Sequence, residues 1–119
     1  IAPFEMNVNQ ALPLALIINE LVSNAYEFAF IGRNEGEIHV ELQKHKNEIH
    51  LFVRDNGVGL PESFVLEESP TLGTTLVSSY SEQIDSDIKV TTLPEDGTEY
   101  ELIFRHKKAH KGSTAHVVL

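Results

Sequence analysis

Two stretches of alternating apolar and polar residues constrain the fold of this chain most. Apolar side chains occupy every second position of residues 38–43 and 49–54, namely Ile38, Val40, Leu42, Ile49, Leu51 and Val53. Successive side chains of a strand point to opposite faces, so each stretch predicts a strand with one apolar face. The intervening residues 44–47 are few enough to form a hairpin loop. The chain must therefore bury one face of a sheet.

Two more strands, an edge strand and two helices are predicted around this hairpin. Residues 88–92 and 99–104 alternate on either side of a turn at Gly97, and residues 3–8 predict an edge strand. Apolar residues recur at helical spacing in residues 12–30, where Asn9 is the expected N-cap, and in a stretch that begins near Gly73. Together these elements predict an α/β fold, a two-layer α/β sandwich whose mixed, mostly antiparallel sheet is covered on one face by helices.

The composition fits one globular domain and argues against several kinds of partner. With 119 residues, 41% of them hydrophobic, the chain can build one core. The net charge is −9 and no Lys/Arg cluster precedes Arg105, so we expect no nucleic-acid partner. The absence of cysteine and of a membrane-length apolar run favours a cytoplasmic location, with any membrane anchor outside this chain.

We expect residues 1–105 to form the domain and residues 106–119 to be a loose or appended tail, because the tail lacks an apolar period before its last three residues. The chain starts with Ile1 rather than methionine, which favours a fragment of a longer protein.

The segment Asp55-Asn-Gly-Val-Gly59 follows directly on the second strand and is the first candidate for a binding site. A carboxylate at the edge of a sheet can accept a hydrogen bond from the exocyclic amine of a purine. Gly57 and Gly59 have no Cβ, so the backbone can approach a flat ring closely. The same residues also occur in ordinary turns, and by itself the motif predicts only a loop that ends a strand.

Two further groups of polar residues could serve a phosphorylated ligand. Glu20 and Asn24 lie four residues apart on the first helix, so their side chains share one face. An amide oxygen suits Mg²⁺, and a carboxylate can orient water or accept a proton. Gly73 and Thr74 begin the second helix, where free backbone N–H groups attract anions. Solvated helix positions and ordinary helix capping explain the same two patterns.

Four segments, taken in order, resemble the motifs of one family. They are Asn19-Glu-Leu-Val-Ser-Asn24-Ala, Asp55-Asn-Gly-Val-Gly-Leu-Pro61, Leu72-Gly73-Thr-Thr-Leu-Val77 and Gly97-Thr-Glu-Tyr-Glu-Leu. They look like the N, G1, G2 and final Gly-Thr boxes of the catalytic domain of sensor histidine kinases. That domain belongs to the Bergerat-type ATPase superfamily with gyrase, MutL and the ninety-kilodalton heat-shock chaperone, and the spacing is closest to its short-lid subfamily. The match covers about residues 4–104, and four ordered boxes are specific where each alone is not.

At the base end of the site, the resemblance implies that ATP is the ligand. Asp55 would bind the adenine amine, and Gly57 and Gly59 would shape the wall beside the ring. Thr98 would support the base pocket from the neighbouring strand.

At the phosphate end, the resemblance implies Mg²⁺ as a second cofactor. Asn24 would be the Mg²⁺ ligand, and Glu20 would orient a water or act as general base. Leu72, Gly73 and Thr74 would close over the phosphates, at the end of a lid formed by residues 62–72.

Three positions depart from the family pattern. Glu27 stands where a basic residue often reaches the phosphates, and a carboxylate near a triphosphate weakens binding unless a cation lies between them. The third box has one glycine, Gly73, where many relatives have more, which predicts a stiffer lid. Ser86 replaces a glycine that commonly follows the second helix, which predicts local strain. Nucleotide affinity is therefore expected to be weak or strongly dependent on Mg²⁺.

The implied function is that of the ATP-binding catalytic domain of a two-component sensor histidine kinase. Such a domain transfers the γ-phosphoryl group of ATP to a histidine on a dimerisation segment, from which a response regulator receives it. None of the six histidines here heads an amphipathic helix, so the acceptor would lie outside this chain, which would be inactive alone and part of a homodimer. The alternatives are a serine kinase of the anti-sigma type and a degenerate, non-catalytic module for nucleotide binding or protein interaction.

Overall fold

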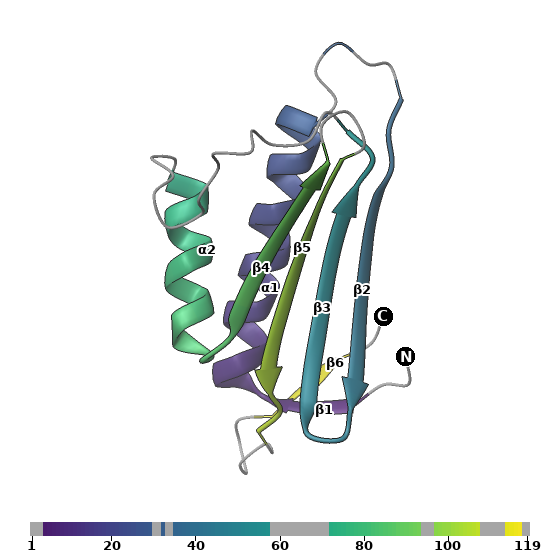
Figure 1. Cartoon of the computed structure of the whole chain (residues 1–119). Helices are drawn as coiled ribbons and strands as arrows, with labels where there is room; N and C mark the ends of the chain where they lie inside the picture. The colour runs from purple at the N-terminus through teal and green to yellow at the C-terminus, as the bar shows by residue number, and fades with distance from the viewer. Residues whose placement is uncertain are drawn as a thin grey trace.

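Four antiparallel strands form the main sheet, and two helices cover one of its faces (Figure 1). A computed structural model describes residues 4–29, 32, 35–57, 72–93, 97–107 and 114–117. The elements are β1 Phe4–Asn7, α1 Val8–Asn24, a π-helix Ala25–Ala29, β2 Ile38–His45, β3 Glu48–Asp55, α2 Leu72–Gln83, β4 Asp87–Leu93, β5 Gly97–Arg105 and β6 Thr114–Val117. The main sheet has the order β2-β3-β5-β4, and each of these pairings is antiparallel. The predicted two-layer α/β sandwich is confirmed.

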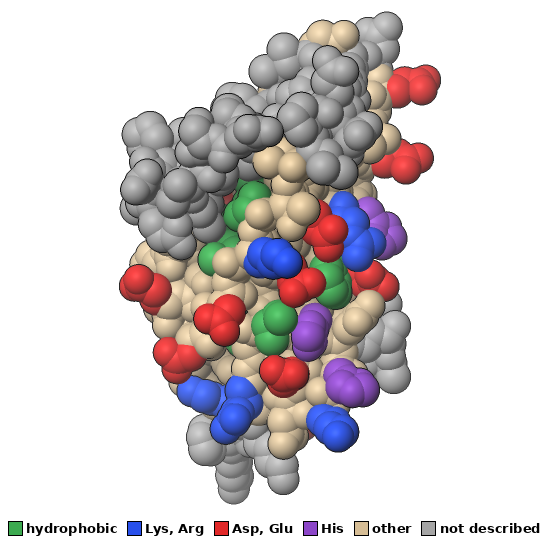
Figure 2. Space-filling view, viewed as in Figure 1, with side chains coloured by type: hydrophobic (Ala, Val, Ile, Leu, Met, Phe, Trp, Pro, Cys, Tyr) green, Lys and Arg blue, Asp and Glu red, His purple; other side chains and the backbone are tan. Residues whose placement is uncertain are grey.

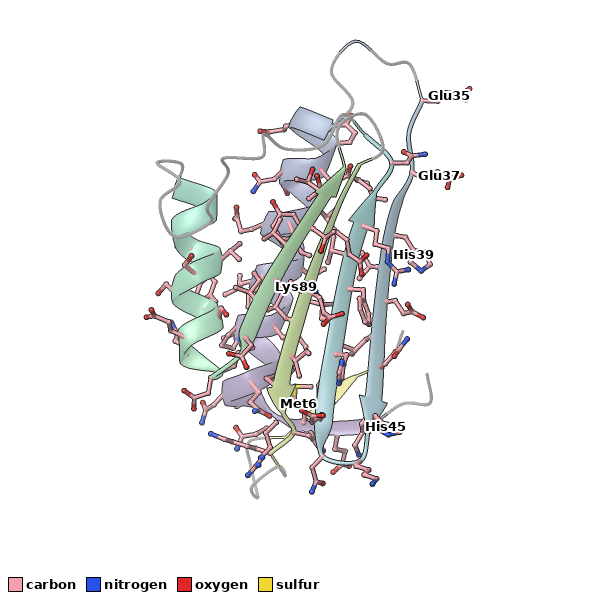
Figure 3. The ribbon with its side chains drawn as sticks, viewed as in Figure 1. Met6, Glu35, Glu37, His39, His45 and Lys89 are labelled. Carbon is pink, nitrogen blue, oxygen red and sulfur yellow. The ribbon has the colours of Figure 1, made fainter. Side chains whose placement is uncertain are left out.

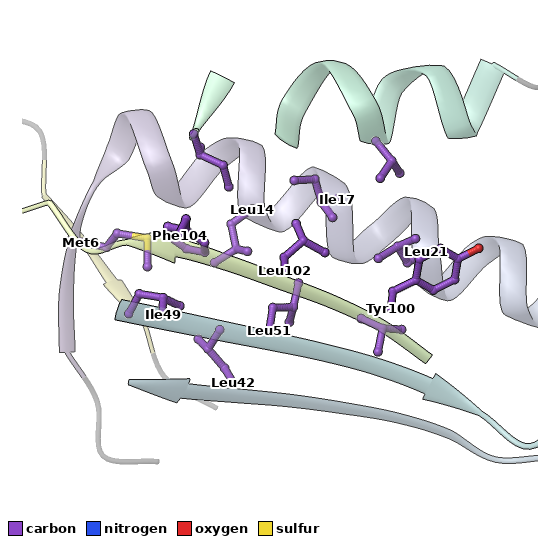
Figure 4. Packing of buried hydrophobic residues seen from close by; sticks show 13 residues of the cluster. Met6, Leu14, Ile17, Leu21, Leu42, Ile49, Leu51, Tyr100, Leu102 and Phe104 are labelled. Carbon is purple, nitrogen blue, oxygen red and sulfur yellow. The ribbon is translucent and has the colours of Figure 1, made fainter. Parts of the chain in front are cut away.

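The core lies between α1, α2 and the inward face of the sheet (Figure 4). Its largest fully buried side chains are Met6, Ile17, Leu21, Ile49, Leu51, Leu102 and Val77. The register places Leu42, Leu51 and Leu102 side by side on three neighbouring strands, as expected for residues of one face. Burial of these apolar side chains, at roughly 25 cal/mol per Å², is the main force that joins the two layers.

The outward face of the sheet carries acidic, basic and histidine side chains with a few hydrophobic ones between them (Figure 2). Arg54 of β3 lies 3.3 Å from a carboxylate oxygen of Glu99 on β5 and 3.8 Å from one of Glu41 on β2. Its guanidinium carbon is 5.0 Å from the ring centre of Phe52. Figure 3 shows His39 and Lys89 on this uncovered side. Exposed ion pairs of this kind contribute about 0–1 kcal/mol each, so they keep the face solvated and add little to stability.

Helix α1 begins earlier than the sequence predicted. Its first residue is Val8, and the N-cap is Asn7 rather than Asn9, because the Asn7 Oδ1 accepts a hydrogen bond from the Asn9 backbone N–H at 2.8 Å. Pro13 lies inside the helix and its side chain is buried. Proline has no N–H to bond the carbonyl four residues earlier, and its ring crowds that carbonyl, so it disfavours the helix, whereas burial of its apolar ring is favourable.

The end of α1 differs from regular helix as well. After Asn24 the chain continues as the π-helix Ala25–Ala29, in which each turn holds more residues than an α turn. The predicted helix of residues 12–30 therefore consists of two forms of helix, and their junction falls at a candidate site residue. Single π turns inside helices are frequent at functional sites.

Helix α2 ends in a Schellman motif, which explains how the chain tolerates the missing glycine. The backbone N–H of Ser86 bonds to the carbonyl of Ser81 at 2.9 Å, and that of Asp85 bonds to Glu82 at 3.1 Å. The positive φ of this motif, 51°, is at Asp85 and not at Ser86. The Ser86 hydroxyl donates to the Ser81 carbonyl at 3.0 Å. The strain predicted for Ser86 is therefore carried by Asp85.

The described residues after β5 are tied to the start of the chain. The Gln10 side-chain amide donates to the Arg105 carbonyl at 2.7 Å, and its oxygen accepts the Lys107 N–H at 2.9 Å. Strand β6 pairs with β1, with Glu5 opposite His116. Residues 114–117 thus depart from the expected loose tail, because their hydrogen bonds are supplied by a strand at the other end of the sequence. The domain boundary at residue 105 stays a prediction.

Candidate functional site

The segments that carry the four sequence motifs meet at one end of the domain. In Figure 1 the C-terminal ends of α1 and β3 and the N-terminal ends of α2 and β5 all lie at the top of the view. These ends hold Asn24, Asp55, Gly73 and Thr98, respectively. The arrangement follows from the topology, since α1 and β3 run toward this end while α2 and β5 start from it. Positions far apart in the sequence are therefore brought to the same end of the sheet.

Asp55 is the last residue of β3 and is half-buried. It has the same parity as Leu51 and Val53, whose side chains are buried, so it belongs to the face that the helices cover. One carboxylate oxygen, Oδ1, accepts the backbone N–H of Gly57 at 2.9 Å. This local bond turns the chain at the strand end, and Gly57 itself is buried.

Asn56 holds this turn from the other side. Its Oδ1 accepts the Glu37 backbone N–H at 2.8 Å, and its own N–H donates to the Glu37 carbonyl at 3.3 Å. The residue between the candidate aspartate and the first glycine is thus tied to the segment that enters β2. As a result, the direction of the Asp55 carboxylate is fixed by hydrogen bonds on both sides of the strand end.

Thr98 lies directly opposite Asp55 in the β3–β5 pairing and is 6% exposed. Its hydroxyl oxygen is 3.4 Å from that of Thr92 on β4, and the Thr92 hydroxyl also donates to the Gly97 carbonyl at 3.3 Å. Gly97 has φ 103°, and a Cβ at this position would overlap the Asp55 carbonyl group, 2.8 Å from its carbon. Glycine is required here because two backbones approach closely.

Glu20 and Asn24 are both half-buried on α1. In the described part of the chain neither side chain has a hydrogen-bond partner, so their oxygens are available to a ligand. An amide and a carboxylate oxygen are donors that suit Mg²⁺, which usually takes few ligands from a protein and the rest from water and phosphate. The described residues contain no group of three or more His, Asp or Glu side chains able to hold a metal by themselves. These residues fit a cation that arrives with a phosphorylated ligand.

Glu27 lies in the π-helix and is exposed. In a regular α-helix Glu27 would lie on the same stripe as Glu20 and Asn24. A π turn holds more residues than an α turn, so a residue three positions after Asn24 points further away from the direction of the Asn24 side chain. The π turn thus separates Glu27 from the stripe that Glu20 and Asn24 share on α1.

The third motif is described only in part. Leu72, Gly73 and Thr74 form the first residues of α2, so their backbone N–H groups lie at a helix N-terminus, as predicted. Gly59 and the predicted lid up to residue 71 lie outside the described residues.

The sequence reasoning missed Tyr100, which the register places near Asp55. Tyr100 is opposite Val53, one inward position along β5 from Thr98, and is 8% exposed. Burial, and then the charge of Asp55, raise the pKa of Tyr100 to about 12. The sequence signal that could have found it is a tyrosine, rather than a purely apolar residue, at an inward strand position. Its nearness to Asp55 depends on the pairing of β3 with β5 and cannot be seen in the sequence.

Comparisons with known proteins agree with this architecture. Residues 9–108 match the family model of histidine kinase-, DNA gyrase B- and HSP90-like ATPases. The sensor histidine kinase PdtaS of Mycobacterium tuberculosis is 32% identical over 96 residues, which cover 79% of this chain and 19% of PdtaS. The nitrate/nitrite sensor protein NarX of Escherichia coli is 28% identical over 100 residues, covering 84% of this chain and 16% of NarX. The chain thus spans about one fifth or less of these relatives.

A solved structure shows the same fold. The blue-light activated histidine kinase EL346 of Erythrobacter litoralis superposes with a TM-score of 0.78 at 23% identity, covering 83% of this chain and 31% of that one. The chain belongs to the family of histidine kinase-, DNA gyrase B- and HSP90-like ATPases. The predicted family is confirmed. None of the helices in the part of the chain that the structure describes is long and apolar enough to span a membrane.

Proposed function

We propose that this chain is the ATP-binding catalytic domain of a two-component sensor histidine kinase. It would bind ATP with Mg²⁺ and transfer the γ-phosphoryl group to a histidine on a dimerisation segment outside the chain. A response regulator would then receive the group, and the full protein would act as a homodimer with this domain in the cytoplasm. The observation that carries the proposal is the meeting of Asn24, Asp55, Thr98 and the start of α2 at one end of the domain.

The base would bind at the end of β3. The Asp55 Oδ1 is engaged by Gly57, and within the described chain Oδ2 has no hydrogen-bond partner, so it can accept the adenine amine. Thr98 adds a buried hydroxyl directly opposite. Gly57, together with Gly59, would let the ring approach the backbone. Recognition of the base would thus rest on groups whose positions the sheet already fixes.

The phosphates would lie between α1 and the start of α2. Asn24 would hold Mg²⁺, which supplies positive charge to offset that of the phosphates. Leu72, Gly73 and Thr74 would contribute backbone N–H groups at the N-terminus of α2. Glu20, one helical turn before Asn24, would orient the attacking group or accept its proton. The chain is strongly acidic, so its overall electrostatic field repels a phosphorylated ligand. The Mg²⁺ ion and the N-terminus of α2 would therefore have to supply the attraction locally.

A titration with a non-hydrolysable ATP analogue, with and without Mg²⁺, tests the proposed site. We expect saturable binding that needs Mg²⁺ and that Asp55→Asn abolishes. Asp87→Asn is a matched control, because Asp87 is exposed at the far end of β4. Asn24→Ala should remove the Mg²⁺ dependence, whereas Asn19→Ala, at an exposed position of the same helix, should not. No binding at millimolar nucleotide would favour the degenerate module instead.

A second experiment separates the two kinase alternatives. The domain is joined to the upstream segment of its full-length protein and incubated with labelled ATP and Mg²⁺. An acid-labile product is expected, because phosphohistidine is hydrolysed in acid. An acid-stable phosphoserine on a partner protein would overturn the assignment and favour the anti-sigma type of kinase. The isolated domain should bind nucleotide without labelling itself.

A further inference from the structure

We infer that Tyr100 is an additional ligand-binding residue, whose hydroxyl donates a hydrogen bond to the base of the nucleotide beside Asp55. The inference rests on the proposed function and deepens it, because it assigns a specificity-determining residue to the base end of that site.

The register places Tyr100 diagonally from Asp55 on the same face of the sheet. Asp55 is paired with Thr98, and Tyr100 is the next residue of β5 that points inward. Diagonal neighbours in an antiparallel sheet are about 7–8 Å apart, within reach of an aromatic side chain. In Figure 4 the Tyr100 ring rises from β5 beside Leu21, and its hydroxyl oxygen points toward the C-terminal part of α1. That is also the direction in which β3 runs toward Asp55.

The Tyr100 hydroxyl lacks a hydrogen-bond partner among the residues that the structure describes. The residue is 8% exposed, so little of the side chain is left to water. The oxygen itself is not sealed off, because within the described part of the chain only the Ser78 hydroxyl is a fully buried side-chain oxygen or nitrogen without a partner. The Tyr100 hydroxyl therefore keeps some exposure, and a ligand can reach it and accept its hydrogen bond. The direction of this hydroxyl, toward the end that holds Asp55 and Asn24, makes the base of a bound nucleotide a suitable partner.

The phenol is also kept in the form that donates. A tyrosine hydroxyl keeps its proton at neutral pH even with its ordinary pKa, and burial and the negative charge of Asp55 raise the pKa of Tyr100 further. Asp55 accepts hydrogen bonds and Tyr100 donates them, so the two residues would read complementary groups on one ring. A purine with both an amine and a ring nitrogen acceptor offers this combination.

The substitution Tyr100→Phe tests the inference, because it removes only the hydroxyl. We expect the affinity for a non-hydrolysable ATP analogue to fall about three- to tenfold, the range for one lost hydrogen bond. The affinity for Mg²⁺-tripolyphosphate, which has no base, should be unchanged. The unfolding midpoint without ligand should stay the same or rise, since no partner within the protein is lost. Tyr80→Phe, near the opposite end of α2, is the matched control and should change none of these values.

Two results would overturn the inference. One is equal affinity of wild type and Tyr100→Phe for the ATP analogue. The other is a lower unfolding midpoint of the ligand-free variant, which would show that the hydroxyl already has a partner in the protein. If wild type itself does not bind the analogue, the proposed function is wrong. If wild type binds it and Tyr100→Phe binds it equally well, only the role of Tyr100 is wrong.

Discussion

Asp55 and Thr98 face each other across the β3–β5 pair, on the side of the sheet that the two helices cover. The pairing joins the second and fourth sequence motifs, so the sheet rather than a loop sets the backbone position of both residues. It also brings Gly97 against the Asp55 carbonyl. The geometry of the candidate base site is therefore coupled to the stability of the sheet, and several substitutions should affect both.

Gly97→Ala should destabilise the domain more than Gly32→Ala does. Both glycines have positive φ, 103° and 77°, and a left-handed conformation costs about 1–2 kcal/mol for other residues. A Cβ at Gly32 meets no atom within 4 Å, whereas one at Gly97 overlaps Asp55. Urea unfolding should show the larger loss for Gly97→Ala, together with weaker nucleotide binding. Equal losses would mean that the close approach of the two strands is unimportant.

The stability of the domain should fall between pH 10 and pH 12 because of Tyr100. The folded-state pKa is about 12 and the unfolded value about 10, so above pH 10 the unfolded chain releases a proton that the folded chain retains. The resulting stabilisation, of the order of 2–3 kcal/mol, is complete below pH 10 and is lost as the pH rises toward 12. Urea titrations across this range should show the loss in wild type and a smaller one in Tyr100→Phe. Tyr26→Phe, at a position 78% exposed, should behave as wild type.

Gln10→Ala should loosen the residues that follow β5. The Gln10 amide satisfies the Arg105 carbonyl and the Lys107 N–H, and both lose their partner in the variant. Arg105 and Lys107 are exposed, so water can partly replace the lost hydrogen bonds. We therefore expect the free energy of unfolding to fall by about 1–2 kcal/mol, the lower part of the range for a lost hydrogen-bond partner. Amide hydrogen exchange at Lys107 should become faster. Gln43→Ala on the exposed edge strand should change neither quantity, and unaltered exchange in Gln10→Ala would contradict the assignment.

Asp85→Gly should stabilise the domain. Asp85 occupies the left-handed position of the Schellman motif after α2, with φ 51°. Glycine adopts this conformation without a Cβ penalty, so we expect a gain of about 0.5–1 kcal/mol after its greater unfolded-state entropy is counted. Thermal unfolding measures the change. Asp87→Gly, which places glycine at the first position of β4, should be destabilising, and a loss of stability in both variants would show that Asp85 is not strained.

The sequence alone predicted the elements that have a clear period. The alternation of Ile49, Leu51 and Val53 predicted β3 and its buried face, because side chains of a strand alternate whatever the rest of the chain does. The boundaries of α1 were less predictable. Asn7 and Asn9 are both suitable caps, and the choice of Asn7 depends on where β1 ends. The π turn after Asn24 has no sequence signal of its own, so the position of Glu27 in a π-helix could not be predicted.

The sequence by itself determined the layers of this protein and predicted its candidate site residues other than Tyr100, since periodicity and short motifs are local properties of the chain. The tertiary structure alone decided which distant residues meet. Strand register places Tyr100 beside Asp55, and the pairing of β1 with β6 fixes a segment that has no period. These outcomes depend on hydrogen bonds and packing between segments that are far apart in the sequence, and the free energies of such contacts cannot be predicted from local patterns.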